Sequence, residues 1–352
     1  MYPVLKADLN KIKENVSIIA KKCGEKNIDI MCVTKVFCAD PTVAQAAVDG
    51  GATMLADSRV KNLMKLQDIN AKKVLIRIPM LSEVESVVKY TDLSFNSEME
   101  TIKAIDAAAK TAGKVHDILL MVDLGDLREG VLPKDVNATV TEILKLDNVN
   151  LYGLGVNLTC YGGIIPSTDN LGQLVEIAKD VEKTFDMKLQ MVSGGNSSSY
   201  YLIENGEMPT GVTNLRPGEL YVLGRETAYG NPVEGLHEDC FTLQGQIVEL
   251  KEKDSMPKGE IGMDAFGNVP SFEDKGKMLR AIVAVGVQDA RPGDLAPRDA
   301  KIDILGASSD HLLLDVTHTA QTFKVGDIVD FSVDYGSLLM LATSEYVTKV
   351  SE

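Results

Sequence analysis

The stretch Ile28-Asp-Ile-Met-Cys-Val-Thr-Lys35 decides the fold class of this chain. It is an apolar run of strand length that ends in a single lysine, and such a run is typical of a strand buried on both faces of a parallel sheet. A lysine at the end of a buried strand either extends its ammonium into solvent or is paired, deprotonated or used covalently. A solvent-exposed lysine and a Schiff-base lysine therefore both stay open at this point.

Short apolar runs of the same kind recur, separated by polar turns and amphipathic helical stretches, over roughly the first 230 residues. The eight runs are 28–35, 53–56, 74–79, 92–95, 118–123, 151–157, 189–193 and 212–215. Eight strands alternating with helices predict an α/β fold, a (β/α)₈ TIM-like barrel. The alternative, an open doubly wound sheet, would need a glycine-rich phosphate turn after its first strand, where this chain has Lys35.

Strand-like runs replace the helical periodicity in the last third of the chain. They lie at 241–250, 279–286, 301–305, 311–316, 328–333 and 338–347, separated by turn signals such as Arg291-Pro-Gly-Asp294. This pattern is typical of a mostly-β domain. We therefore predict two domains, a barrel over residues 1–230 and a C-terminal mostly-β domain over residues 231–352.

Composition excludes several classes of partner. The net charge of −15 over 352 residues argues against nucleic acid or a membrane surface as the main partner and is compatible with a cationic small substrate. No apolar run reaches membrane length, and the N-terminus does not resemble a signal peptide. The five scattered cysteines predict reduced thiols and a cytoplasmic protein. The four histidines have no metal-ligand spacing, so we expect no metal.

The carboxyl ends of the barrel strands should carry the active site. The polar residues found there are Lys35, Asp57, Arg77, Asn96, Asp123, Arg128, Asn157, the Ser193-Gly-Gly-Asn-Ser-Ser-Ser199 segment and Arg216-Pro-Gly-Glu219. The last two segments follow the seventh and eighth strands, where barrels often bind phosphate, although the first of them could also be an ordinary helix-capping turn. We expect Asp57, Arg77 and Asn96 to be structural.

A lysine and a phosphate-binding turn at one barrel mouth suit a phosphorylated aldehyde, and pyridoxal 5'-phosphate is the obvious candidate. A Schiff-base aldolase is the other candidate. Such aldolases usually carry their lysine later in the barrel and lack an appended β-domain.

Ordered motifs from about Lys6 onward resemble the fold type III pyridoxal-phosphate enzymes, and specifically the alanine racemase family. The matching segments are Val33-Thr-Lys35-Val36, Val122-Asp-Leu-Gly-Asp-Leu-Arg128-Glu-Gly130, Gly195-Asn196-Ser197, Leu215-Arg216-Pro-Gly218, Gly306-Ala-Ser-Ser309-Asp310 and Asp334-Tyr335. Single motifs are weak signals, whereas the ordered set is a strong one.

The resemblance implies a role for each segment. Lys35 would carry the cofactor and act as one base, and Arg128 would contact the cofactor phenolate and the substrate carboxylate. Arg216 would face the pyridine nitrogen, and Asn157 stands where the family has a histidine under the ring. The remaining cofactor-binding residues would be Ser193, Gly195, Asn196, Ser197, Gly218, Glu219 and Tyr335. Ser309 and Asp310 would complete the active site of a partner subunit, which implies a homodimer with shared active sites.

Asn157 and three further departures from the family pattern argue against alanine as the substrate. Met121 stands in place of a lysine, often carbamylated, that orients the arginine, Ala39 in place of a tyrosine, and Asp264 in place of the tyrosine that serves as second base. The segment Gly259-Glu-Ile-Gly-Met-Asp264-Ala-Phe-Gly267 resembles the ornithine-racemising branch of the family.

Together these features predict a pyridoxal-phosphate-dependent racemase that interconverts L- and D-ornithine with Lys35 and Asp264 as its two bases. Asp264 could instead hold the distal ammonium of ornithine, with Tyr161 or Cys160 as the second proton donor. Other readings are a racemase of lysine, arginine, alanine or serine, a decarboxylase of basic amino acids, or a non-enzymatic pyridoxal-phosphate-binding protein. A decarboxylase would pair a glutamate with the pyridine nitrogen, where this chain has Arg216, and the non-enzymatic class lacks a β-domain.

Overall fold

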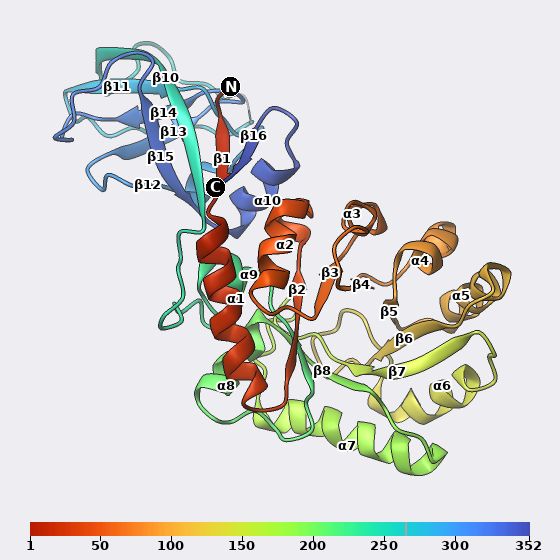
Figure 1. Ribbon diagram of the computed structural model, residues 1–352. Helices are drawn as coiled ribbons and strands as arrows, with labels where there is room; N and C mark the ends of the chain where they lie inside the picture. The colour runs from red at the N-terminus through yellow and green to blue at the C-terminus, as the bar shows by residue number, and fades with distance from the viewer. Residues whose placement is uncertain (265) are drawn as a thin grey trace. The chain divides into compact units, whose positions relative to one another are not determined.

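The computed structural model describes residues 1–264 and 266–352 and divides them into two compact units (Figure 1). One unit is formed by Leu9–Cys240, and the other combines Met1–Asp8 with Phe241–Glu352. The division therefore falls ten residues later than the predicted boundary at 230/231, and it assigns the first eight residues to the β unit instead of the barrel.

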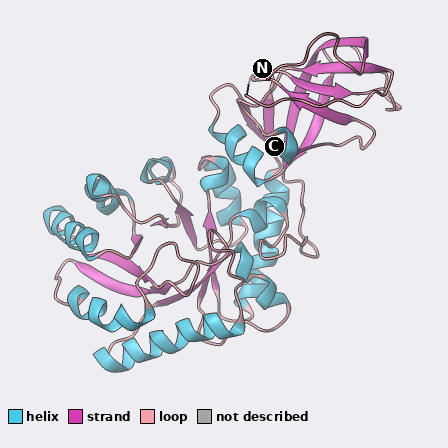
Figure 2. Cartoon of the chain, turned by 180° about the vertical axis from the view of Figure 1, so that it is seen from behind, coloured by secondary structure: helices cyan, strands magenta, loops and turns pink. Residues whose placement is uncertain are grey.

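The Leu9–Cys240 unit is a closed barrel of eight parallel strands with helices around it, as predicted (Figures 1 and 2). Its strands are β2 (Asp29–Val33), β3 (Met54–Asp57), β4 (Lys72–Leu75), β5 (Leu93–Asn96), β6 (His116–Met121), β7 (Val149–Gly155), β8 (Met191–Asn196) and β9 (Asn214–Arg216). Its helices are α1 (Leu9–Gly24), α2 (Pro41–Asp49), α3 (Val60–Lys65), α4 (Val84–Tyr90), α5 (Met99–Ala112), α6 (Val136–Ile143), α7 (Thr168–Phe185), α8 (Tyr201–Glu204) and α9 (Glu219–Leu223). Pairing of β2 with both β3 and β9 closes the barrel.

Buried apolar side chains fill the barrel and fix its helices. The interior cluster includes Met31, Val33, Met54 and Phe95, which alternate along their strands and point to the inside. Short 3₁₀ turns at η1 (Lys35–Phe37), η2 (Leu81–Glu83), η3 (Pro133–Asp135) and η4 (Ser197–Ser199) follow several strand ends. The ends of β2 and β8 therefore lead almost directly into short turns, which carry Lys35 and Ser197.

The second unit is built on an eight-stranded sheet. Its strands are β1 (Val4–Ala7), β10 (Phe241–Asp254), β11 (Lys277–Val283), β12 (Leu295–Pro297), β13 (Asp303–Ala307), β14 (Leu312–Asp315), β15 (Ile328–Val333) and β16 (Thr348–Ser351), with the short turn η5 (Pro292–Asp294) before β12. The sequence did not predict β1, which pairs antiparallel with β10 and parallel with β16.

The predicted strand at 338–347 is wrong, because the chain forms helix α10 (Tyr335–Thr343) there. Leu338, Leu341 and Ala342 are buried, and this spacing of three and four residues is that of one helix face. A short continuous apolar run has no periodicity that separates a buried strand from a buried helix, so the pattern alone could not decide.

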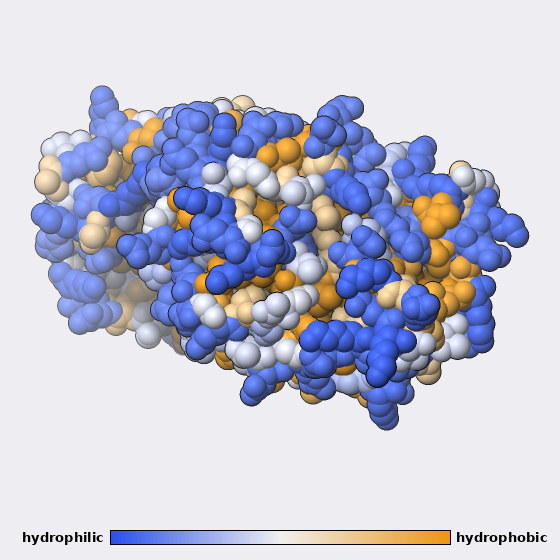
Figure 3. Space-filling view, turned by 60° about the horizontal axis from the view of Figure 1, so that its bottom comes forward, coloured by the Kyte–Doolittle hydropathy of each residue, from blue (hydrophilic) through white to orange (hydrophobic). Residues whose placement is uncertain are grey.

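Across the described residues, no helix has the length and apolar character needed to cross a membrane. The face of the molecule drawn in Figure 3 is mostly hydrophilic, with hydrophobic side chains in separate groups between the polar ones.

Candidate active site

Lys35 stands at the carboxyl end of β2, where it begins η1, and its side chain is exposed. The residue before it is fixed, because the Thr34 hydroxyl donates to Oδ2 of Asp57 at 2.7 Å and to the Ala56 carbonyl at 3.1 Å. Asp57 is fully buried, and this burial raises the pKa of its carboxyl, while hydrogen bonds from Thr34, Arg59 and Asn62 oppose the shift. Hydrogen bonds from Thr34 to Asp57 and Ala56 therefore hold the end of the strand just before the lysine.

The segment after β9 is tied to the same strand end. The Val33 N–H donates to the Pro217 carbonyl at 2.8 Å, and the Tyr221 hydroxyl donates to the Val33 carbonyl at 2.9 Å. These two bonds place the backbone just before Lys35 beside the Arg216-Pro-Gly218 segment. The first and last strands of the barrel thus bring predicted site residues together that are more than 180 positions apart in the chain.

Arg216 is buried at the end of β9, with 3% of its surface exposed. Its guanidinium donates to the Ser193 hydroxyl at 2.7 Å, to the Val156 carbonyl at 2.8 Å and to Asn157 Oδ1 at 3.4 Å. Its guanidinium carbon lies 5.1 Å from the centre of the Phe95 ring. Burial lowers its pKa to about 10, so the side chain remains a cation at neutral pH.

Two asparagines join the ends of β7 and β8. Asn196 donates to Asn157 Oδ1 at 3.2 Å, to the Leu158 carbonyl at 3.0 Å and to Cys160 Sγ at 3.4 Å. The Asn157 amide nitrogen is buried and has no hydrogen-bond partner within the described part of the chain. A buried donor without a partner is costly, so the site has a polar atom ready to bind a ligand.

The turn after β8 has the backbone that a close approach requires. Gly195 has a φ of +112°, and a Cβ there would lie 2.5 Å from the Ser199 hydroxyl oxygen. The Ser197 hydroxyl accepts hydrogen bonds from the N–H groups of Gly218 at 3.0 Å and Leu220 at 3.2 Å. Glu219, the first residue of α9, follows directly in the chain. Ser198 Oγ is buried and, among the described residues, has no partner.

Arg128 lies in the segment that follows β6, between Met121 and η3. Its Nε and Nη2 atoms donate to the two carboxylate oxygens of Glu129. This ion pair, together with the nearby Cys160, raises the pKa of the guanidinium above its usual value. The sequence analysis chose Arg128 but not Glu129, because a carboxylate next to an arginine in the chain is seldom its partner.

The other predicted residues lie in the β unit. Asp264 is exposed, and its Oδ1 accepts from the N–H groups of Phe266 at 2.9 Å and Asn268 at 2.8 Å. Ser309 and Asp310 are exposed in the turn between β13 and β14, where the serine hydroxyl donates to the aspartate at 2.7 Å. Tyr335 begins α10. These four residues therefore belong to a different unit from the barrel residues.

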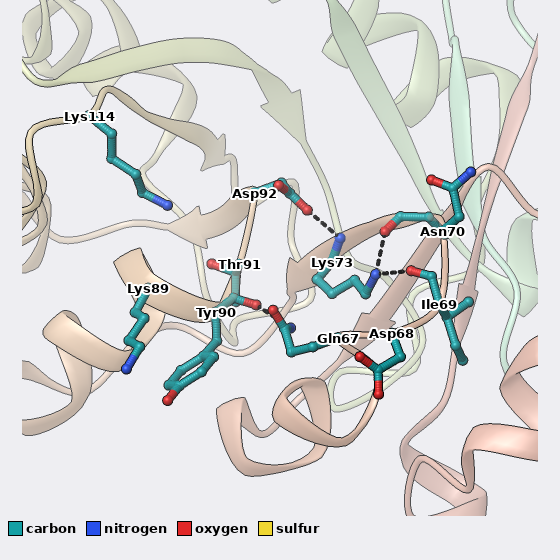
Figure 4. A pocket seen from close by; sticks show the side chains of 11 residues that line it. Gln67, Asp68, Ile69, Asn70, Lys73, Lys89, Tyr90, Thr91, Asp92 and Lys114 are labelled. Atoms are coloured by element: carbon teal, nitrogen blue, oxygen red, sulfur yellow. Dashed lines mark hydrogen bonds between the residues drawn. The ribbon is translucent and has the colours of Figure 1, made fainter.

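A pocket of about 450 Å³ lies at the opposite, amino-terminal end of the barrel strands (Figure 4). Its lining comes from the turns that precede β4, β5 and β6 and contains no residue predicted for the site. Within it, Lys73 is buried and donates to the carbonyls of Ile69 and Ala71. In barrel enzymes this end is associated with stability, so we do not assign the chemistry to it.

The fold and the site together define a class of protein. The chain has a closed parallel barrel and a separate, mostly antiparallel β unit. The barrel carries a lysine, a buried arginine and a serine-asparagine turn at its strand ends. Residues 7–225 match the family model for the alanine racemase N-terminal domain. The chain belongs to the alanine racemase family.

Individual relatives and solved structures agree with this family. The chain is 52% identical to ornithine racemase of Acetoanaerobium sticklandii over 99% of both chains. It is 37% identical to lysine racemase of Thermotoga maritima, over 100% of this chain and 99% of the relative. Alanine racemase of Clostridium difficile 630 superposes with a TM-score of 0.77 at 18% identity, covering 99% of this chain and 95% of that one. Alanine racemase of Bartonella henselae with covalently bound pyridoxal phosphate gives a TM-score of 0.73 at 15% identity, with 99% of both chains covered.

Proposed function

We propose that this protein is a pyridoxal-phosphate-dependent racemase that interconverts L- and D-ornithine. The observation that carries the proposal is the 52% identity to an ornithine racemase over 99% of both chains. The acidic character of the chain, with a net charge of −15, agrees with a substrate that carries a second ammonium group.

The barrel mouth fits this cofactor in several independent respects. Lys35 supplies a primary amine at an exposed strand end, as an aldehyde requires. The Gly195 turn leaves no space for a side chain, and Ser198 Oγ and Asn157 Nδ2 are buried polar atoms for which the described residues provide no partner. We propose that Ser193, Gly195, Asn196, Ser197, Gly218, Glu219 and Tyr335 contribute to the cofactor site, with Asn157 beside them.

Different residues of the chain would have different roles in racemisation. When bound, pyridoxal phosphate would supply the electron-withdrawing group that makes the substrate Cα–H bond acidic. Lys35 removes or returns the Cα proton on one face. Arg216, held by Ser193 and the Val156 carbonyl, is a permanent cation that would disfavour protonation of the pyridine nitrogen. Arg128 binds the substrate carboxylate.

Asp264 and the turn at Ser309 and Asp310 are proposed to act in a neighbouring subunit. All three side chains are exposed and lie in the β unit, so they are accessible to a second copy. We therefore propose a homodimer with shared active sites. Among the described residues no disulfide joins the five cysteines, which supports the proposal of a reducing, cytoplasmic location.

Lysine is the second candidate substrate, because the chain is also 37% identical to a lysine racemase over its full length. Lysine differs from ornithine by one methylene group, and a pocket that recognises the distal ammonium separates the two mainly by length. A decarboxylase is disfavoured, because it would need a carboxylate where Arg216 is buried.

The test is incubation of the purified protein with pyridoxal phosphate and L-ornithine, L-lysine or L-alanine in deuterated water. We expect loss of optical rotation and deuterium at Cα with ornithine first, and no release of carbon dioxide. A Lys35→Ala variant is the control and should lose both signals. Racemisation of alanine in preference to ornithine, or a wild-type protein that takes up no cofactor, would overturn the proposal.

A further inference from the structure

We propose that Glu129 is the positioning residue that orients Arg128 for the substrate carboxylate. The inference rests on the proposed racemase function and names the group that replaces the orienting lysine of the family. In the family that lysine is often carbamylated and so anionic; in this chain its position is Met121, so a different residue must supply the negative charge.

The contact between the two side chains has the geometry of a bidentate pair. Nε of Arg128 donates to one Glu129 oxygen, and Nη2 donates to the other at 2.5 Å. Glu129 is the more buried partner, with 16% of its side chain exposed against 41% for Arg128. The carboxylate occupies one edge of the planar guanidinium, so the edge that carries Nη1 is the one that can bind a second carboxylate.

The loop backbone explains how two consecutive residues can face each other. The Asp123 carboxylate accepts hydrogen bonds from the N–H groups of Gly125 and Leu127, and Leu127 has a φ of +57°. Gly130 follows with a φ of +139°, and a Cβ there would lie 2.4 Å from the Asp123 nitrogen. Val131 then pairs with the end of β6 through its N–H and the Met121 carbonyl at 2.9 Å. The closed loop therefore holds the pair against the strand end.

Met121 cannot take over this role. Its side chain is buried with 1% exposed and belongs to the apolar interior cluster of the barrel. A thioether carries no charge and is only a weak acceptor. The position that the resemblance assigns to a lysine is thus part of the hydrophobic core here, and the charge that faces Arg128 comes from the loop.

The surrounding charges give Glu129 a second effect. The guanidinium of Arg128 acts to lower the pKa of buried Arg216, whereas Glu129 acts to raise it. The Glu129 carboxylate therefore offsets the repulsion between two cations that face one site. Asp126 connects the loop that carries Arg128 to the loop after β7. Its carboxylate accepts hydrogen bonds from the N–H groups of Tyr161 at 3.2 Å and Gly162 at 3.0 Å.

The first test measures Arg128 directly, without any enzymatic reaction. Phenylglyoxal modifies exposed arginines, and mass spectrometry of peptides gives the rate at Arg128 relative to the exposed Arg59. In the Glu129→Gln holoenzyme we expect the relative rate at Arg128 to rise about fivefold, because the guanidinium is released from its partner. The matched control is Glu142→Gln, which removes the carboxylate of an exposed pair with Lys145. An unchanged rate in Glu129→Gln would overturn the inference.

The second test separates positioning from folding. For Glu129→Gln we expect the KM for ornithine to rise about tenfold, with the absorbance of the bound cofactor unchanged, and Glu129→Asp should recover part of the loss. A KM within twofold of wild type would contradict the inference. If Arg128 reacts faster in the variant but the wild type racemises no amino acid, the Glu129 contact stands and the proposed function fails.

Discussion

At the scale of single residues, the exposure and the hydrogen bonds of Asp264 bear on the choice between its two proposed roles, second base and substrate anchor. Its carboxylate is exposed and accepts hydrogen bonds from the N–H groups of Asn268 and Phe266, and these bonds lower its pKa. A carboxylate with a lowered pKa is a weaker base and a more persistent anion. We therefore propose that Asp264 holds the distal ammonium of ornithine rather than acting as the second base.

Replacing Asp264 with asparagine distinguishes the roles. If the aspartate is an anchor, Cα deuterium exchange should fall by a similar factor for D- and L-ornithine, and the KM should rise about tenfold, because an ion pair is lost from the site. Exchange is followed by mass spectrometry with each enantiomer separately. A loss confined to one enantiomer would restore the base role, and Asp254→Asn, an exposed aspartate in the same unit, is the control.

His116 should make the stability of the barrel depend on pH. The side chain is 1% exposed, and burial lowers its pKa to about 4. Its Nε2 lies 3.0 Å from the Ser94 hydroxyl, and its Nδ1 is buried and lacks a partner within the described residues. The folded state therefore keeps this histidine neutral, whereas the unfolded chain binds a proton near pH 6.5.

The sign of the effect follows from this difference. The contribution is fully present above pH 6.5 and is lost as the pH falls toward 4, up to roughly 3 kcal/mol and about 2 kcal/mol by pH 5. Urea unfolding at pH 7.5 and pH 5 measures it. His116→Gln should flatten this dependence, whereas His237→Gln, at an exposed histidine paired with Glu14, should not. Equal slopes in wild type and His116→Gln would contradict the prediction.

At the scale of elements, the turn after β8 tolerates no side chain at Gly195. Alanine there would have to adopt a φ of +112° and would meet the Ser199 hydroxyl oxygen at 2.5 Å. The turn must shift to relieve both problems, so we expect Gly195→Ala to weaken cofactor binding about tenfold or more. Absorbance titration with pyridoxal phosphate measures the change, and a Kd within twofold of wild type would refute it.

Gly172 provides the matched glycine. It lies inside helix α7, and a Cβ there would meet no atom within 4 Å. Gly172→Ala should leave cofactor binding unchanged and raise the free energy of unfolding by about 0.5–1 kcal/mol, because alanine favours the helix.

Most barrel strands could be predicted because a strand that is buried on both faces has a continuous run of apolar residues in the sequence. Each of the eight predicted runs overlaps a barrel strand, and the residues after them, such as Lys35 and Arg216, stand at the mouth. The predictions failed where the sequence has no run of this kind or where such a run also fits a helix. β1 has only four residues, and α10 consists of a continuous apolar run. The loop that carries Arg128 and Glu129 has a positive φ at Leu127, for which a leucine gives no signal.

At the scale of the whole molecule, shared active sites can be tested by mixing two variants and measuring racemisation at ornithine concentrations far below the KM, where each variant alone is expected to be inactive or strongly weakened. Lys35→Ala removes the amine of the barrel unit, and Asp264→Ala removes a proposed contribution of the β unit to a neighbouring subunit. A mixed dimer would contain one site with both residues intact. With random exchange of subunits at equal amounts, about a quarter of the wild-type activity should return. Ornithine racemisation after co-refolding measures it, and each variant refolded alone is the control.

The outcome that contradicts shared sites is equally clear. If mass spectrometry shows that mixed dimers form and the mixture stays inactive, the β unit does not complete a neighbour's site. Wild-type activity in Asp264→Ala alone at low ornithine would also exclude a contribution from that residue.

The pairing of β1 with β10 and β16 has a consequence for biosynthesis. Val4–Ala7 leaves the ribosome before the barrel, but its hydrogen-bonding partners at Phe241–Asp254 and Thr348–Ser351 are translated after it. The barrel can therefore form while strand β1 still lacks its pairing strands. The β unit is completed late, through contacts between residues that are far apart in the sequence. A nascent chain arrested after Cys240 should yield a protease-resistant barrel with a clipped amino-terminal end.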